Sequence, residues 1–176
     1  MAEVLKPRVV RLGYLGEFFR CMAHQPKPLR AFVEFTEFAK APLDKHIVEI
    51  IALTISTRKA NSYERNQHER LCVRLGFGRE WISQVEALSP ESAQLLDNRE
   101  KQVQRFVLSA IDEHREESQI IFSALVESLG YAQAIAILMV VGRYVAHTVM
   151  VTALGIGPPV PSIYEDGFDV TQSPAT

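Results

Sequence analysis

Apolar residues recur at three- and four-residue intervals along most of the chain, and this spacing is the period of an α-helix. Proline and glycine interrupt the pattern where helices would end. Together these signals predict helices over 15–23, 28–40, 45–57, 61–75, 77–88, a stretch that ends near 114, 119–129 and 131–154. Because no convincing pair of strands is present, we predict an all-α fold, a helical bundle of about seven or eight helices.

Residue types that start and end helices support these boundaries. Gly76 directly follows 61–75, at a position that favours a left-handed cap. The expected N-terminal caps are Asp44, Ser89 ahead of Pro90, Asp97 in a capping box with Glu100, and Ser118. The helix that ends near 114 therefore has two candidate starts.

Every residue of the run 47–55 is apolar or small except Glu49. Burying a lone carboxylate costs several kcal/mol unless the carboxylate is paired or its pKa rises, so Glu49 needs a partner. His68, nineteen residues on, is the nearest candidate. Helical spacing places four polar side chains on one inward face of the next helix: Asn61, Glu64, His68 and Cys72. The sequence thus predicts a carboxylate on one helix facing a carboxylate and an imidazole on the next.

Composition and net charge limit which classes of protein this chain can belong to. A chain of 176 residues can bury one substantial core, and a net charge of −2 offers no basic surface for nucleic acid. The two cysteines, Cys21 and Cys72, form no CxxC or zinc-type spacing, and the N-terminus lacks the apolar core of a signal peptide. We therefore expect a cytoplasmic protein without a nucleic-acid partner.

The segment 132–157 is the one stretch that resembles a membrane span. Its uninterrupted apolar run is short, because Arg143 and then His147 interrupt it, and an arginine near a bilayer centre is costly. We predict a buried helix covered by its own chain and by a neighbouring subunit, with no membrane as a partner. On this helix Arg143 and His147, one turn apart, are more typical of packing and solvated polar groups than of a site.

Three parts of the chain are expected. Residues 1–27 form a lead-in with a short helix, 28–158 form the helical domain, and 159–176 form a tail. The tail lacks regular pattern, but Ile163, Tyr164 and Phe168 offer apolar anchors. It is therefore expected to be either disordered or an arm that lies on a neighbouring subunit.

The strings LDKHIVEIIALTIS and NSYERNQHERLCVRLGFGREWISQVEAL resemble the carboxymuconolactone decarboxylase and alkylhydroperoxidase D-like (AhpD-like) superfamily. In its peroxidase branch a glutamate stands twelve residues before a CxxCxxxH motif, and Glu49 and His68 keep that spacing. Asn61 and Glu64 occupy the two cysteine positions, so the redox cysteines are lacking. The decarboxylase branch has a YExxxH pattern, which Tyr63, Glu64 and His68 reproduce. The resemblance covers roughly 28–158, including the closing string GRYVAHTVMVTALGIGPP.

This resemblance implies a cofactor-free acid/base lyase or isomerase that acts on a small lactone or unsaturated carboxylic acid. Glu49 would orient His68, whose other ring nitrogen would exchange a proton with the substrate, and Glu64 would be a second acid/base group. A carboxylate substrate needs a cation, and Arg58, Arg65 and Arg143 are candidates. The expected substrate-binding residues are Asn61, Tyr63, Arg65 and Arg143. The resemblance also implies a homotrimer or hexamer.

Other interpretations stay open. Cys72 lies one turn beyond His68 and offers a single-thiol peroxidase, as an alternative to a non-catalytic oligomeric binding protein. Glu64 is also suited to a capping box with Asn61, and His68 with Glu49 to a purely structural pair. A further interpretation has Glu49 capping a helix or pairing with Arg58 or Lys45 at the surface. No metal is predicted, because two carboxylates and one histidine lack a recognisable ligand spacing.

Overall fold

The structure, a computed structural model, describes residues 5–6, 9–10 and 14–165. Eight complete helices lie within these residues: α2 (Glu17–Met22), α3 (Pro26–Lys40), α4 (Lys45–Arg58), α5 (Ser62–Arg74), α6 (Arg79–Glu86), α7 (Asn98–Ile111), α8 (Arg115–Leu129) and α9 (Tyr131–Leu154). The described residues contain no strand. The predicted all-α class and the predicted number of helices are confirmed.

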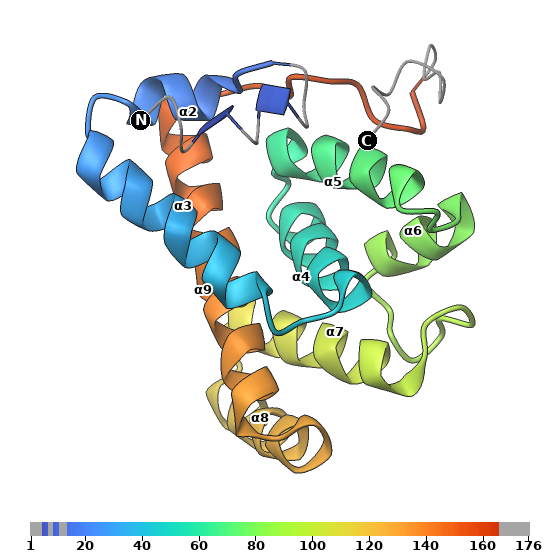
Figure 1. Cartoon of the computed structure of the whole chain (residues 1–176). Coiled ribbons are helices and arrows are strands. Elements are labelled where there is room, and N and C mark those ends of the chain that lie inside the picture. The colour runs from blue at the N-terminus through green and yellow to red at the C-terminus, as the bar shows by residue number, and fades with distance from the viewer. Residues whose placement is uncertain (1–4, 7–8, 11–13, 166–176) are drawn as a thin grey trace.

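Helix α4 lies at the centre of the molecule. Figure 1 shows α5, α6, α7 and α9 arranged around it, and α4 contacts all four. Every residue from Ile47 to Ser56 is buried, because an apolar surface that covers the whole circumference of a helix must be enclosed on every side. Helix α3 lies beside α9, and α8 packs against α7 and α9. Glu49 is therefore held inside the core.

The predicted N-terminal caps are present at two of the helices. The Asp44 side chain accepts a hydrogen bond from the Ile47 amide (2.9 Å) at the start of α4. Asp97 and Glu100 form both halves of the capping box that starts α7. Gly76 has a positive φ of 84°, as a left-handed position after α5 requires.

Two other predicted caps are wrong. Helix α8 begins at Arg115, and the Ser118 hydroxyl, inside its first turns, donates to the Ser109 hydroxyl (3.2 Å). No helix starts at Ser89, whose hydroxyl donates to the Ala87 carbonyl (3.2 Å) in a turn. A serine that bonds nearby backbone competes with helix formation, so α7 begins only at the capping box.

Helix α9 is long and apolar enough to cross a membrane by length and composition, with a mean hydropathy of 1.8. Half of that apolar window is nevertheless buried inside this chain, against α3, α4 and α8. The buried side chains include Tyr144 and His147, and both are polar groups that need partners within the protein. The predicted buried helix is therefore present.

The segment 158–165 lies on α5 of its own chain. The buried carboxylate of Glu69 accepts hydrogen bonds from the Ser162 hydroxyl (2.5 Å) and the Ile163 amide (2.8 Å). The amide of Asn66 donates to the Val160 carbonyl (2.9 Å). An arm on a neighbouring subunit is thus the wrong interpretation for this part. The prediction for 166–176, Phe168 included, lies outside the described residues, as do parts of the lead-in.

The central position of α4 leads to a stability prediction. Ile51 is fully buried, so Ile51→Ala is expected to lower the free energy of unfolding by about 2–5 kcal/mol through lost burial and a cavity. The matched control is Ile120→Ala on α8, where the side chain is 71% exposed and the change should stay within about 0.5 kcal/mol. Urea unfolding of both variants measures the difference, and equal losses would contradict a core centred on α4.

Candidate active site

Glu49 and His68 meet in the interface between α4 and α5. His68 Nδ1 lies 2.6 Å from Glu49 Oε2, and both side chains are almost completely buried. A carboxylate at this distance fixes the ring orientation and favours the tautomer with a proton on Nδ1. The surface pairing of Glu49 with Arg58 or Lys45 is therefore wrong: Arg58 is bonded to Asp112 instead.

Glu64 forms the second contact of the His68 ring and links α5 to α9. Its Oε2 lies 3.0 Å from His68 Nε2. Its Oε1 lies 2.9 Å from Arg143 Nη1 and 2.8 Å from His147 Nδ1. Asn61 does cap the helix, since its side chain accepts from the Glu64 amide (3.3 Å), but the Glu64 carboxylate turns inward instead of completing a capping box.

A tyrosine and a lysine extend this cluster toward α3. Tyr144 Oη lies 3.1 Å from His68 Nε2, and Lys40 Nζ donates to Tyr144 Oη (2.8 Å). A hydrogen-bonded chain thus runs from Glu49 through His68 and Tyr144 to Lys40, with one residue from each of α4, α5, α9 and α3. The expectation that the second nitrogen of His68 is free is wrong, because Glu64 and Tyr144 both contact it.

The charges of the cluster determine its protonation. Burial acts to raise the pKa of Glu64, but His147 and Arg143 outweigh it and hold that pKa well below 4.5. Burial acts to lower the pKa of His68, but Glu49 and Glu64 outweigh it and raise that pKa above 6.5. The two carboxylates on either side of the ring therefore favour its imidazolium form. Burial, the largest effect on His147, keeps its pKa below 6.5, so that ring is neutral.

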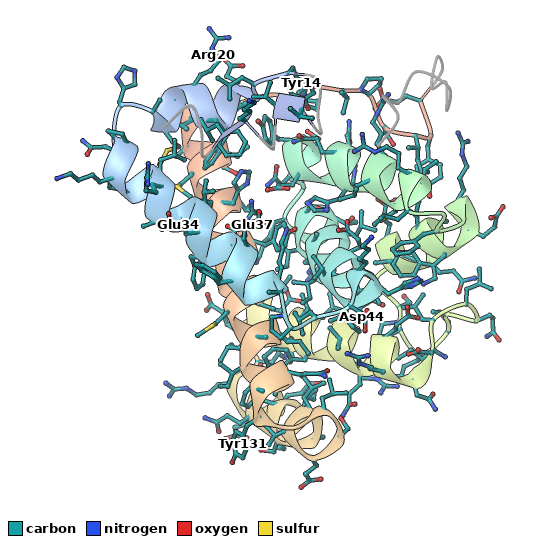
Figure 2. All side chains as sticks on the ribbon, in the orientation of Figure 1. Tyr14, Arg20, Glu34, Glu37, Asp44 and Tyr131 are labelled. Atoms are coloured by element: carbon teal, nitrogen blue, oxygen red, sulfur yellow. The ribbon has the colours of Figure 1, made fainter. Side chains whose placement is uncertain are left out.

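A cavity of about 90 Å³ lies beside the cluster, between α3, α5 and α9. It is large enough for about three water molecules, each with a share of roughly 30 Å³ in the liquid. The lining comprises Phe19, Thr36, Glu37, Lys40, Tyr63, Glu64, Gln67, His68, Leu71, Arg74, Arg143 and His147. Glu37, labelled in Figure 2, extends from α3 on the side toward α4. The wall contains three basic side chains, Lys40, Arg74 and Arg143, against the two carboxylates of Glu37 and Glu64, so the cavity suits a small anion.

The predicted substrate-binding residues divide into two groups. Tyr63 and Arg143 line the cavity, and the Tyr63 hydroxyl accepts from the Phe18 amide (3.4 Å). Arg65 and Asn61 lie outside the lining of this cavity, which does not support their assignment to substrate binding. Arg65 Nε pairs with Glu69 (3.2 Å), one turn along the same helix, and Asn61 Nδ2 donates to Thr148 (3.1 Å).

Cys72 lies behind the cluster and outside the cavity lining. Its side chain is fully buried, and its sulfur donates to Glu49 Oε2 (3.7 Å). Burial, with Glu49 next in effect, raises the pKa of this thiol above its ordinary value, so the reactive thiolate is disfavoured. Among the described residues, no group of three or more His, Cys, Asp and Glu side chains is arranged to hold a metal ion.

The sequence analysis did not predict that Lys40, Tyr144 and His147 belong to the cluster around His68 and Glu64. Arg143 and His147 are one turn apart in an apolar helix, and both meet Glu64 instead of packing or facing solvent. The argument used for Glu49, that a polar group in an apolar run needs a partner, applies equally to these two residues. Lys40 carries no such signal, because a basic residue in the last turn of a helix is ordinary.

Comparison with known proteins identifies the class of fold. No family model matches the chain, and no curated protein matches it. Its helical arrangement is that of the AhpD-like fold. The AhpD core of an uncharacterised peroxidase-related protein from Ralstonia eutropha JMP134 superposes with a TM-score of 0.75 at 19% identity, covering 89% of this chain and 83% of that one. A protein of unknown function from Agrobacterium tumefaciens, described as a candidate antioxidant-defence protein AhpD, superposes with a TM-score of 0.71 at 13% identity, covering 80% and 96%.

These likenesses establish the fold that the sequence resemblance predicted. At such low identity they carry no activity across. With cysteine only at positions 21 and 72, the chain also contains no CxxC motif. The chemistry must therefore be argued from the side chains of this cavity.

The buried position of Glu64 leads to a prediction for acid pH. Glu64→Gln leaves Arg143 uncompensated in the interior, so we expect a loss of about 3–5 kcal/mol in the free energy of unfolding at neutral pH. Because folding depresses the pKa of Glu64, this stabilisation is complete above pH 4.5 and is lost as the pH falls toward the folded pKa.

Denaturant unfolding of the wild type and the variant between pH 3 and pH 7 measures that difference. Exposed Glu34 on α3 gives the control, since Glu34→Gln should change stability by less than about 0.5 kcal/mol at every pH. A difference for Glu64→Gln that stays constant across this range would show that the carboxylate charge is not what stabilises the fold.

Proposed function

We propose that this protein is a cofactor-free acid/base enzyme, a lyase or isomerase that acts on a small carboxylic acid or lactone. One observation carries the proposal: the imidazole of His68 lies between the carboxylates of Glu49 and Glu64 in the wall of a cavity that also exposes the guanidinium of Arg143. A buried proton donor beside a cation can hold a carboxylate and protonate the carbon next to it.

The residues suggest a sequence of steps. Arg143 attracts the carboxylate of the substrate, and Tyr63 and Phe19 line the rest of the cavity. When the bond to carbon dioxide breaks, its electron pair stays on the substrate as a dienolate or carbanion. The Nε2 proton of His68 then passes to that carbon, directly or through the Tyr144 hydroxyl. Glu49 stabilises the imidazolium before the transfer and the Nδ1–H tautomer after it.

The pH dependence of this step follows from the charges. Because the pKa of His68 is raised, its acid form persists to higher pH than that of an ordinary histidine and is lost as the pH rises further. The transfer therefore favours neutral or mildly acidic pH, above the range in which Glu64 takes up a proton. An isomerisation would use the same proton in both directions, with Glu64 or the neutral ring of His68 as the base.

His68→Gln tests the proposal most simply. A panel of small unsaturated carboxylic acids and lactones is screened for release of carbon dioxide and for deuterium uptake in D₂O. Loss of the acid group is expected to lower turnover by about 10²–10⁴-fold while the variant stays folded. Cys72→Ala is the control and should keep wild-type turnover, because the thiol lies outside the cavity. Full turnover in folded His68→Gln would refute the role, and sulfenic acid trapped at Cys72 under peroxide would favour the thiol peroxidase.

We also propose that the protein is a homo-oligomer, a trimer or a hexamer. Helices α3 and α9, which pack together, leave apolar side chains exposed: Phe35, Phe38, Leu138 and Met139. Exposed apolar residues in such number on adjoining helices favour contact with another copy. Sedimentation should give a trimer or hexamer that Phe38→Glu weakens, whereas Ile120→Glu on α8 should not. A wild-type monomer at micromolar concentration would contradict the proposal.

A further inference from the structure

Lys40 is the one lysine in the lining of the cavity. It lies in the last turn of α3, and its Nζ donates to the Tyr144 hydroxyl (2.8 Å) and lies 5.0 Å from the centre of that ring. The proposed proton transfer by His68 does not require it. A lysine placed in a small cavity beside a hydrogen-bonded hydroxyl and a guanidinium is arranged for chemistry of its own.

The surroundings of Lys40 raise its fraction of free amine above that of an ordinary lysine. Burial and the neighbouring guanidinium of Arg143 lower the pKa of Lys40 to about 8. The carboxylates of Glu49, Glu64 and Glu37, on α4, α5 and α3, act in the opposite direction but do not restore it. His68, a further positive charge, meets the same tyrosine hydroxyl from the other side. Compared with an ordinary lysine, the fraction of free amine near neutral pH rises by more than about a hundredfold.

We propose that the amine of Lys40 forms an imine with the carbonyl carbon of a small oxo carboxylic acid, whose carboxylate is held by Arg143. The contacts of Arg143 to Glu64 and Thr36 use two of the five N–H donors of a guanidinium, so a further carboxylate can be bound. This inference names the substrate class of the proposed function and rests on it for the loss of carbon dioxide, while the imine itself can be tested without turnover.

The imine step balances without another reactant. The nitrogen of Lys40 attacks the carbonyl carbon, the C–N bond forms, and the carbonyl oxygen takes a proton from the Tyr144 hydroxyl, which His68 replenishes. Loss of water then gives the iminium. In a 3-oxo acid, the bond to the carboxylate can now break, because its electron pair moves into the iminium to give an enamine and carbon dioxide. Protonation of the enamine carbon and hydrolysis release a ketone and restore the amine.

The size of the cavity supports a small oxo acid. Its volume of about 90 Å³ equals that of about three water molecules, so a ligand with a short carbon skeleton is the better match than a larger lactone. The iminium is also a stronger acceptor for the electron pair of the broken bond than the carbonyl group it replaces. Lys40 would thus bind the carbonyl end of the ligand, and Arg143 would bind its carboxylate end.

Reductive trapping tests this proposal. The full-length protein is incubated with acetoacetate or glyoxylate and sodium cyanoborohydride, which delivers hydride to an iminium carbon and makes the C–N bond permanent. Peptide mass spectrometry should locate the adduct at Lys40, with a yield that rises as the pH increases through about 8. An isopropyl adduct from acetoacetate would show that carbon dioxide was lost before reduction.

Matched variants separate the site from general lysine reactivity. Lys40→Arg keeps the charge but cannot form an imine, so adduct at this site is lost. Lys27→Arg, an exposed position on the same helix, should leave the yield at Lys40 unchanged. Tyr144→Phe should lower the trapping rate at least about tenfold, because proton transfer to the carbonyl oxygen is lost.

Two results would overturn the imine: labelling spread evenly over exposed lysines, or unchanged total labelling in Lys40→Arg. These outcomes differ from failure of the proposed function. If an adduct forms at Lys40 but acetoacetate loses no carbon dioxide when the reductant is omitted, the imine is supported and the lyase activity is rejected. Turnover that survives in Lys40→Arg but is lost in His68→Gln would keep the acid/base enzyme and reject the imine.

Discussion

The buried charge cluster around His68 is the constraint on which the rest of the structure depends. Two carboxylates, Glu49 and Glu64, approach opposite nitrogens of one ring at 2.6 and 3.0 Å inside an apolar core. Positive charge between and beside such a carboxylate pair stabilises it, and the raised pKa of His68 and the guanidinium of Arg143 favour that charge. Because these groups come from α4, α5 and α9, their compensation also fixes how the three helices pack.

The same cluster explains why the cavity beside it favours an anion. His68 and Arg143 balance the two buried carboxylates, and Lys40 lies beside them with the exposed carboxylate of Glu37 as a further acidic neighbour in the lining. A carboxylate ligand in the cavity would be a further partner for Lys40 and Arg143. The charge that stabilises the fold and the charge that would bind a ligand therefore belong to one network, joined through the Tyr144 hydroxyl.

The sequence predicts the fold well because its signals are local. A helix apolar on every side must be central, and the capping box of Asp97 and Glu100 determines a boundary by two hydrogen bonds. The predicted caps at Ser89 and Ser118 are wrong because a serine hydroxyl can bond either to a helix terminus or to another neighbour. The sequence alone does not distinguish these two kinds of hydrogen bond. In the site, Glu49 and His68 are predictable from burial, whereas the contact of Lys40 with α9 depends on helix packing that no local pattern encodes.

The protonation of His68 tests this account most directly. ¹⁵N NMR of the protein labelled in its histidine rings reports whether each nitrogen carries a proton. The account predicts that at pH 7 both nitrogens of His68 are protonated, and that replacing one carboxylate by Glu49→Gln lowers the pH at which the ring becomes neutral. A neutral ring at pH 7 in the wild type, with one nitrogen unprotonated, would contradict the imidazolium on which both the fold and the proposed chemistry are built.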